Sequence, residues 1–222
     1  MIDVRMFTVG PVQENAYIVR LADADHAVMV DPGDEAERLL GALEALSITT
    51  VEAILLTHTH FDHVGAVAPV ARATGAPVYC PELETHILAD INGYMRLPGF
   101  GPFESYDADE TVKGGETLNL AGMQFEVSFV PGHSPGHVAY AVRDSDAIFS
   151  GDVLFQGSVG RVDLPGGDWP TLLSSIDSLM KAYPAETTVY PGHMGITSLG
   201  AERDSNPFLR DLAGPTTTSH LK

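Results

Sequence analysis

The chain contains one histidine-rich heptapeptide, Thr57-His58-Thr59-His60-Phe61-Asp62-His63, with three imidazoles and a carboxylate close together. It follows directly after the apolar run Ala53-Ile54-Leu55-Leu56. A short run of branched apolar residues predicts a buried strand, so these polar side chains emerge where a strand ends. Open α/β sheets keep their ligand sites at such strand ends. The heptapeptide therefore predicts a metal site in an α/β protein.

The spacing within the heptapeptide predicts room for two metal ions. In an extended backbone, residues i and i+2 point the same way. His58 and His60 can therefore bind one ion, while Asp62 and His63 turn toward a neighbouring position. The alternative interpretation is a chance gathering of histidines in a polar turn.

Three later segments repeat one pattern, a short apolar strand followed by glycine and a ligand-type residue. They end in Gly132-His133, Gly151-Asp152 and Gly192-His193. Glycine allows backbone turns that a Cβ would obstruct, so the next side chain can be aimed inward. If these strand ends converge with the heptapeptide, they supply a shared set of metal ligands: His58, His60, Asp62, His63, His133, Asp152 and His193.

Composition limits the classes of partner. A chain of 222 residues with 44% hydrophobic content can bury a substantial core, and no linker divides it, so we expect one domain over residues 1–222. A net charge of -18 argues against nucleic-acid binding. The first thirty residues do not combine a basic start with an apolar core, and no apolar run in the sequence has the length of a membrane span. We therefore expect a cytoplasmic protein that acts on a small molecule, with no nucleic-acid or membrane partner and an undetermined oligomeric state.

The apolar pattern predicts strands and helices in alternating blocks. Expected strands are Val4–Val9, Asn15–Arg20, Ala27–Val30, Val51–Leu56, Pro77–Cys80, Leu118–Leu120, Met123–Val130 and Val138–Val142. Three helices are expected. The first begins after Asp34, which would cap it, and the second runs from Val64 to Thr74 and stops at Gly75. The third begins near Asp168. The two halves echo each other, which predicts an α/β fold with two sheets face to face and helices outside, a four-layer αββα sandwich.

Several residues outside the ligand set are candidates for other roles. Residues 81–111 are acidic and helical in character to about Ile91, then dense in Gly, Pro and aromatics over residues 92–103. We interpret them as a lid or pocket wall, with Tyr94, Arg96 and Phe100 as substrate contacts, or alternatively as a surface packing loop. Arg161 could hold an anionic substrate group or form a structural ion pair. His137 could support the metal site or the core. Cys80, the single cysteine, is expected to be a packed thiol, and the tail from residue 214 is expected to fray.

The ligand segments resemble those of the metallo-β-lactamase superfamily, in order and through most of the chain. The resemblance implies that His58, His60 and His133 hold one metal ion and that Asp62, His63 and His193 hold a second. Asp152 would bridge the two ions. The αββα sandwich of that family agrees with the layers expected from the sequence.

Within the superfamily, Asp152 is unlike the cysteine of the zinc β-lactamases and similar to the glyoxalase II group. Residues 151–163 resemble compact bacterial glyoxalase II-like hydrolases. Full-length glyoxalase II has a C-terminal helical domain that helps hold glutathione, and residues 194–222 are too few to form it. The resemblance therefore implies hydrolysis of a thioester, such as S-lactoylglutathione or a related acyl-thiol, without requiring glutathione.

The implied cofactor is a pair of divalent metal ions, zinc in the first instance, with iron or manganese also suited to imidazole and carboxylate ligands. Two such ions lower the pKa of a shared water from about 15.7 toward about 7, giving a metal-bridging hydroxide. Asp62 and Asp152 would be catalytic by orienting this nucleophile. Three alternatives stay open: an iron-dependent persulfide dioxygenase, a lactonase, and a metal-stabilised binding domain without activity.

Overall fold

The first half of the chain forms a six-stranded sheet. This computed structural model describes residues 1–94 and 99–210. The first three strands form an antiparallel meander, and the later strands pair in parallel. In spatial order the strands are β1 (Ile2–Val9), β2 (Glu14–Leu21), β3 (His26–Val30), β4 (Thr50–Leu55), β5 (Val78–Pro81) and β6 (Glu110–Val112).

The second half forms another six-stranded sheet. All neighbouring strands pair antiparallel except β10 and β13, which are parallel. In spatial order the strands are β14 (Thr197–Ser198), β13 (Thr188–Pro191), β10 (Ala147–Gly151), β9 (Val138–Val142), β8 (Met123–Phe129) and β7 (Thr117–Leu120). A short hairpin, β11 (Leu154–Phe155) and β12 (Ser158–Val159), follows β10.

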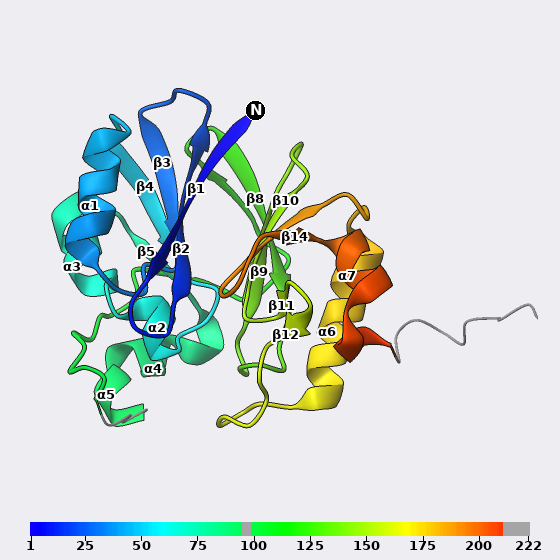
Figure 1. Cartoon of the computed structure of the whole chain (residues 1–222). Helices are drawn as coiled ribbons and strands as arrows, with labels where there is room; N and C mark the ends of the chain where they lie inside the picture. The colour runs from blue at the N-terminus through cyan, green and yellow to red at the C-terminus, as the bar shows by residue number, and fades with distance from the viewer. Residues whose placement is uncertain (95–98, 211–222) are drawn as a thin grey trace, which may run out of the picture.

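The two sheets pack face to face with helices on both outer faces (Figure 1). Helices α1 (Ala36–Ala45) and α3 (Val67–Thr74) cover the first sheet. Helices α6 (Trp169–Ala182) and α7 (Leu199–Ser205) cover the second. A separate apolar cluster fills the space between the sheets. This arrangement confirms the predicted αββα sandwich.

Strand β2 shows how the sequence produces these layers. Successive side chains of a strand point to opposite faces of the sheet. Ala16 and Ile18 join the cluster beneath α1 and α3, whereas Tyr17 and Val19 join the cluster between the sheets. Both faces of β2 are therefore covered, which explains the continuous apolar run at residues 16–19.

The helix predicted from Val64 to Thr74 starts later than predicted, after a separate turn. Phe61–Val64 forms a single turn, α2, and α3 starts only at Val67. The break allows Asp62 and His63 to turn toward the site before the covering helix begins. Pro69 lies in the first turn of α3, where its missing N–H is not needed. Gly75 ends α3 in a left-handed conformation, as predicted.

The prediction that Asp34 caps the first helix is wrong. Glu35 precedes α1 in a left-handed conformation, and no side chain caps that helix. Asp34 instead accepts a hydrogen bond from the Glu35 N–H at 2.6 Å. Asp34 therefore stabilises the turn that leads into the helix.

Residues 81–111 begin with short helical segments, as the sequence predicts to about Ile91. They include a 3-10 turn (Glu82–Glu84), α4 (Thr85–Ala89) and α5 (Ile91–Tyr94) before β6. A second 3-10 turn, Pro207–Leu209, anchors the end of the described chain through buried Leu209. The predicted frayed tail from residue 214 lies outside the described residues. Among the described helices, none has the length and hydropathy needed to cross a bilayer.

Candidate metal centre

The predicted ligands come from strand ends that meet at one end of the sandwich, where α2 and the β11–β12 hairpin lie (Figure 1). His58 and His60 follow β4, His133 follows β8, Asp152 follows β10 and His193 follows β13. One of the preceding glycines is required by the site itself. A Cβ on Gly192 would stand 2.3 Å from Asp152 Oδ1 and 2.6 Å from His63 Cε1. Only a residue without a side chain fits there.

The first ligand group consists of His58, His60 and His133, whose ring nitrogens lie within 4.8 Å of one another. His60 Nδ1 is 3.0 Å from His58 Nε2 and 2.8 Å from His133 Nε2. His133 Nδ1 lies 2.8 Å from the Arg161 carbonyl oxygen, so Nδ1 carries the proton and Nε2 presents a lone pair. Three ring nitrogens therefore converge on one point in the manner of a metal site.

The second ligand group consists of Asp62, His63 and His193. Asp62 Oδ2 lies 3.2 Å from His193 Nε2 and 4.0 Å from His63 Nε2. The far nitrogen of His193 faces the Gln13 carbonyl oxygen at 3.2 Å. That contact leaves His193 Nε2 free to act as a ligand.

Asp152 lies between the two groups. Its Oδ1 is 3.3 Å from His63 Nε2 in the second group. Its Oδ2 is 3.4 Å from His133 Nε2 in the first group and 3.6 Å from His193 Nε2 in the second. This carboxylate is thus placed where it could bridge two ions.

The residues present fit a pair of cations. His63 Nε2 and Asp152 Oδ1 are buried and make no hydrogen bond. A buried polar atom without a partner is costly, and a coordinated cation would remove that cost. The donors are imidazole nitrogens and carboxylate oxygens, which suit zinc, iron or manganese. The geometry therefore accommodates two divalent ions.

Burial also prepares the first group for a metal ion. It lowers the pKa of His60 to about 3, with neighbouring His133 adding to the effect, and it lowers the pKa of His58. Metal ions bind the neutral imidazole, so these rings need lose no proton at neutral pH. For His63, burial favours the neutral ring, but Asp152 and Asp62 outweigh it and raise the pKa. A cation in the second group would therefore displace a proton from His63.

Three buried residues that support the site were not predicted from the sequence. The Asp31 carboxylate lies 3.0 Å from His63 Nδ1. Glu84 accepts hydrogen bonds from Thr59 and from Gly136, and so joins two ligand loops. Glu14 lies 3.7 Å from His63 Nδ1, and its burial raises its pKa well above the usual value.

Of these three, only Asp31 had a usable signal. It follows the apolar strand β3 directly, the same pattern that marks the ligands. His137, considered for a supporting role, accepts a hydrogen bond from the Asp152 N–H through Nε2 at 3.0 Å. It is fully buried behind the ligands.

A cavity of about 720 Å³ opens above the two groups. Both predicted catalytic carboxylates, Asp62 and Asp152, line it. Two of the predicted substrate contacts, Phe100 and Arg161, line it as well. Tyr94 is not among the described lining residues, and its ring lies against His86 on the neighbouring helix. The predicted contact Arg96 lies outside the described residues.

Comparison with curated proteins gives full-length relatives. The probable metallo-hydrolase YqgX of Bacillus subtilis is 42% identical over 211 residues, covering 94% of this chain and 98% of the relative. Hydroxyacylglutathione hydrolase GloC of Haemophilus influenzae is 34% identical over 209 residues, covering 93% and 98%. This chain is thus similar to compact proteins of nearly its own length.

Comparison with solved structures gives the same fold. BLEG-1 B3 metallo-beta-lactamase is 43% identical with a TM-score of 0.87, covering 93% of this chain and 99% of that one. TTHA1623, solved in a di-iron-bound form, is 44% identical with a TM-score of 0.82, covering 92% and 100%. The model of the metallo-beta-lactamase superfamily matches residues 9–193, which include every predicted ligand. The chain therefore belongs to the metallo-beta-lactamase superfamily of metal-binding hydrolases.

Proposed function

We propose that this protein is a binuclear metal-dependent hydrolase that cleaves acyl thioesters. The observation that carries the proposal is the placement of Asp152 between two three-residue ligand groups at the floor of one large cavity. Bound divalent ions would supply Lewis acidity and water of lowered pKa at this floor. No nucleophilic side chain is then required, which agrees with Cys80 being fully buried within β5.

The chain's own residues have defined tasks in this reaction. Asp62 and Asp152 present carboxylate oxygens to the cavity, where they accept hydrogen bonds from the attacking water and fix its direction. The Arg161 and Gln13 carbonyls fix the ring orientations of His133 and His193. A site held in this way needs little rearrangement during the reaction, which lowers its barrier.

Two observations favour a thioester. The relative named hydroxyacylglutathione hydrolase aligns over nearly its whole length. An aspartate stands at position 152, where the family resemblance sets this chain apart from the zinc β-lactamases with their cysteine. As part of this proposal, we expect a small-molecule substrate and a cytoplasmic location.

A second candidate activity is hydrolysis of a β-lactam amide. It is favoured by the 43% identity to a structure named as a B3 metallo-beta-lactamase. The same floor of ligands and carboxylates could serve a strained amide carbonyl. A chromogenic cephalosporin, assayed beside thioesters, separates the two activities.

The test uses protein purified without added metal. Elemental analysis gives the identity and number of bound ions, and hydrolysis of S-lactoylglutathione gives the activity. We expect two ions for each chain and thiol release that is lost in His133→Ala and Asp152→Ala. Turnover that survives either substitution would contradict the proposal. Dioxygen uptake with glutathione persulfide, or turnover of lactones alone, would support the alternatives raised from the sequence.

A further inference from the structure

The wall of the cavity indicates which thioester fits. Apolar side chains dominate the lining and include Val12, Phe61, Phe100, Phe155, Leu164 and Met194. Two of them, Val12 and Met194, are 37% and 56% exposed at the rim. Exposed apolar side chains gathered around a concave site indicate an apolar ligand.

Three phenylalanine rings form an aromatic cluster on one side of this wall. The Phe61 ring centroid lies 5.1 Å from that of Phe100 and 5.5 Å from that of Phe103. Phe61 stands between ligands His60 and Asp62 in the sequence, so this aromatic cluster is attached directly to the metal centre. Aromatic contacts of this geometry stabilise a fixed arrangement of rings.

The loop that carries Phe103 is held in place by the fold. Phe103 N donates to Asn92 Oδ1 at 2.9 Å, and Asn92 Nδ2 donates to the Phe103 carbonyl at 2.7 Å. A Cβ on Gly65 would lie 3.0 Å from the Phe103 ring, so glycine permits this close packing. The aromatic cluster is therefore a preformed surface.

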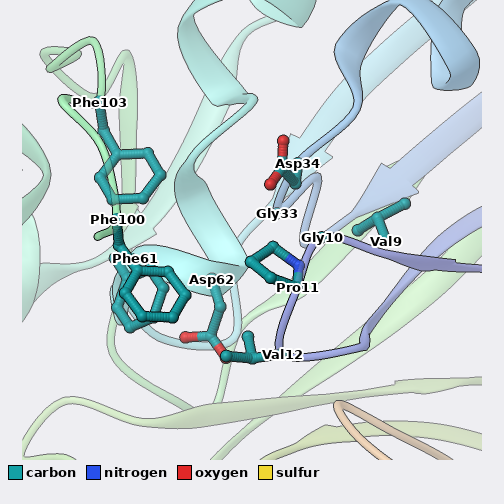
Figure 2. A pocket seen from close by; sticks show the side chains of 10 residues that line it. All are labelled: Val9, Gly10, Pro11, Val12, Gly33, Asp34, Phe61, Asp62, Phe100 and Phe103. Atoms are coloured by element: carbon teal, nitrogen blue, oxygen red, sulfur yellow. The ribbon is translucent and has the colours of Figure 1, made fainter. Parts of the chain in front are cut away.

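Figure 2 shows these rings facing Pro11 and Val12 across a narrow slot, with Asp62 between the two sides. The slot shares Val12, Phe61, Asp62 and Phe100 with the large cavity. An apolar group that lies along this side of the cavity would contact the aromatic cluster. The thioester bond joined to that group would still reach the carboxylates of Asp62 and Asp152 at the floor of the large cavity.

The side chains of the described cavity lining give an anionic thiol few cationic partners. Among the described lining residues, Arg161 is the one Lys or Arg, and its guanidinium donates to Asp163 at 2.6 and 2.7 Å. The whole chain carries a net charge of -18. Glutathione has two carboxylates, and tight recognition of carboxylates needs cationic partners that are not already paired.

We propose that the preferred substrate is a thioester of an apolar, ring-sized acyl group and an uncharged thiol. The acyl group lies in the large cavity and packs against the side lined by Phe61 and Phe100. This inference rests on the proposed thioesterase function. In the reaction, the oxygen of water bonds to the acyl carbon and the carbon–sulfur bond breaks, giving a carboxylate, a thiol and one proton.

The test compares four thioesters on the metal-containing protein. Acetyl and phenylacetyl groups are each joined to neutral N-acetylcysteamine and to glutathione, and thiol release gives kcat/KM. We expect phenylacetyl to exceed acetyl by about 10-fold or more, because discrimination of this size follows from a few buried apolar carbons. We expect no gain when glutathione replaces N-acetylcysteamine.

The outcomes separate this inference from the proposed function. Glutathione thioesters preferred by 10-fold or more, or acetyl preferred over phenylacetyl, would overturn the inference and leave thioester hydrolysis in place. If metal-containing protein cleaves none of these thioesters or S-lactoylglutathione, both fail.

A matched pair of variants tests the aromatic cluster. Phe100→Ala is expected to lower kcat/KM for the phenylacetyl thioester about 10-fold more than kcat/KM for the acetyl thioester, with metal content little changed. Phe208→Ala, which removes an exposed ring that packs on Trp169 away from the cavity, should change neither. Equal losses of both thioesters in Phe100→Ala would assign Phe100 a structural role only and overturn its part in selection.

Discussion

Asp31 Oδ2 lies 3.0 Å from His63 Nδ1, and both side chains are buried. The same carboxylate accepts hydrogen bonds from the Thr57 N–H at 2.7 Å and the Thr57 hydroxyl at 2.6 Å. A histidine that donates one ring N–H to a carboxylate has its tautomer and orientation fixed, and its other nitrogen becomes a better ligand. Asp31 thus connects the start of the heptapeptide to its last ligand.

The first prediction concerns Asp31→Asn. Loss of such a supporting carboxylate typically weakens metal binding about 10–100-fold. We expect the affinity for the ion in the second ligand group to fall by this factor, because Asp31 faces His63. The affinity for the ion in the first ligand group should fall less. Competition with a chelator of known affinity measures both steps. Asp177→Asn, which removes an exposed carboxylate paired with Lys181, is the matched control. Two ions bound as tightly as in the parent protein would contradict this role.

The second prediction concerns Glu84, which joins the loops of the first ligand group. One oxygen accepts from the Thr59 N–H and hydroxyl, and the other accepts from the Ser134 hydroxyl and the Gly136 N–H. Glu84→Ala leaves these buried donors without a partner, at roughly 1–3 kcal/mol each before relaxation. We expect a loss of at least about 3 kcal/mol in the free energy of unfolding.

Urea unfolding measures this loss. Glu82→Ala, an exposed carboxylate in the same 3-10 turn, should change the free energy of unfolding little. If the two variants unfold at the same urea concentration, Glu84 does not hold the loops together.

The contrast between Asp31 and Glu84 shows what the sequence could predict about the site. That the predicted ligands would meet could be predicted, because each follows a local pattern, an apolar strand that ends in a turn and a residue of metal-binding type. Asp31 obeys that pattern at the end of β3, but Pro32 and Gly33 follow it, which is also typical of an ordinary turn between two elements. Glu84 has no local pattern, because its partners lie 25 to 52 residues away.

The same distinction applies to the fold. The layers follow from the period of apolar residues, which fixes which face of each strand is buried. The division between α2 and α3 was not predictable from that period, because it depends on where Asp62 and His63 must point. Tyr94 and Phe100 look equally suitable as pocket residues in the sequence. Only the path of the chain brings Phe100, and not Tyr94, to the described cavity lining.

The third prediction concerns protein stripped of metal by a chelator. The pKa of His60 in the folded chain is about 3, against about 6.5 when unfolded, so the unfolded chain binds more protons between these values. The free energy of unfolding should therefore fall as pH falls below about 6.5, by up to about 1.4 kcal/mol per pH unit for each such group. His58 acts in the same direction.

His63 has a raised pKa, so its contribution is present below about 6.5 and is lost as pH rises above that value. Urea midpoints of the metal-free protein between pH 4.5 and 8 measure the balance. Metal-free His60→Gln should show a shallower decline in acid, because one titrating group has been removed. Stability that increases steadily from pH 6.5 to 4.5 would show that these rings are not held neutral.

The fourth prediction concerns Cys80, which lies fully buried in β5. Burial raises the pKa of its thiol, so the folded protein keeps the proton at pH values where an unfolded thiol, with a pKa of about 8.5, has lost it. The native thiol should therefore resist iodoacetamide at pH 8 and react quickly only in urea.

For the same reason, the free energy of unfolding should decline above about pH 8.5, where only the unfolded chain releases this proton. Cys80→Ala should remove that part of the alkaline decline and keep metal content and turnover within about two-fold, at a packing cost of about 1 kcal/mol. Rapid labelling of the native protein, or loss of turnover with metal content preserved, would instead place this thiol in the reaction.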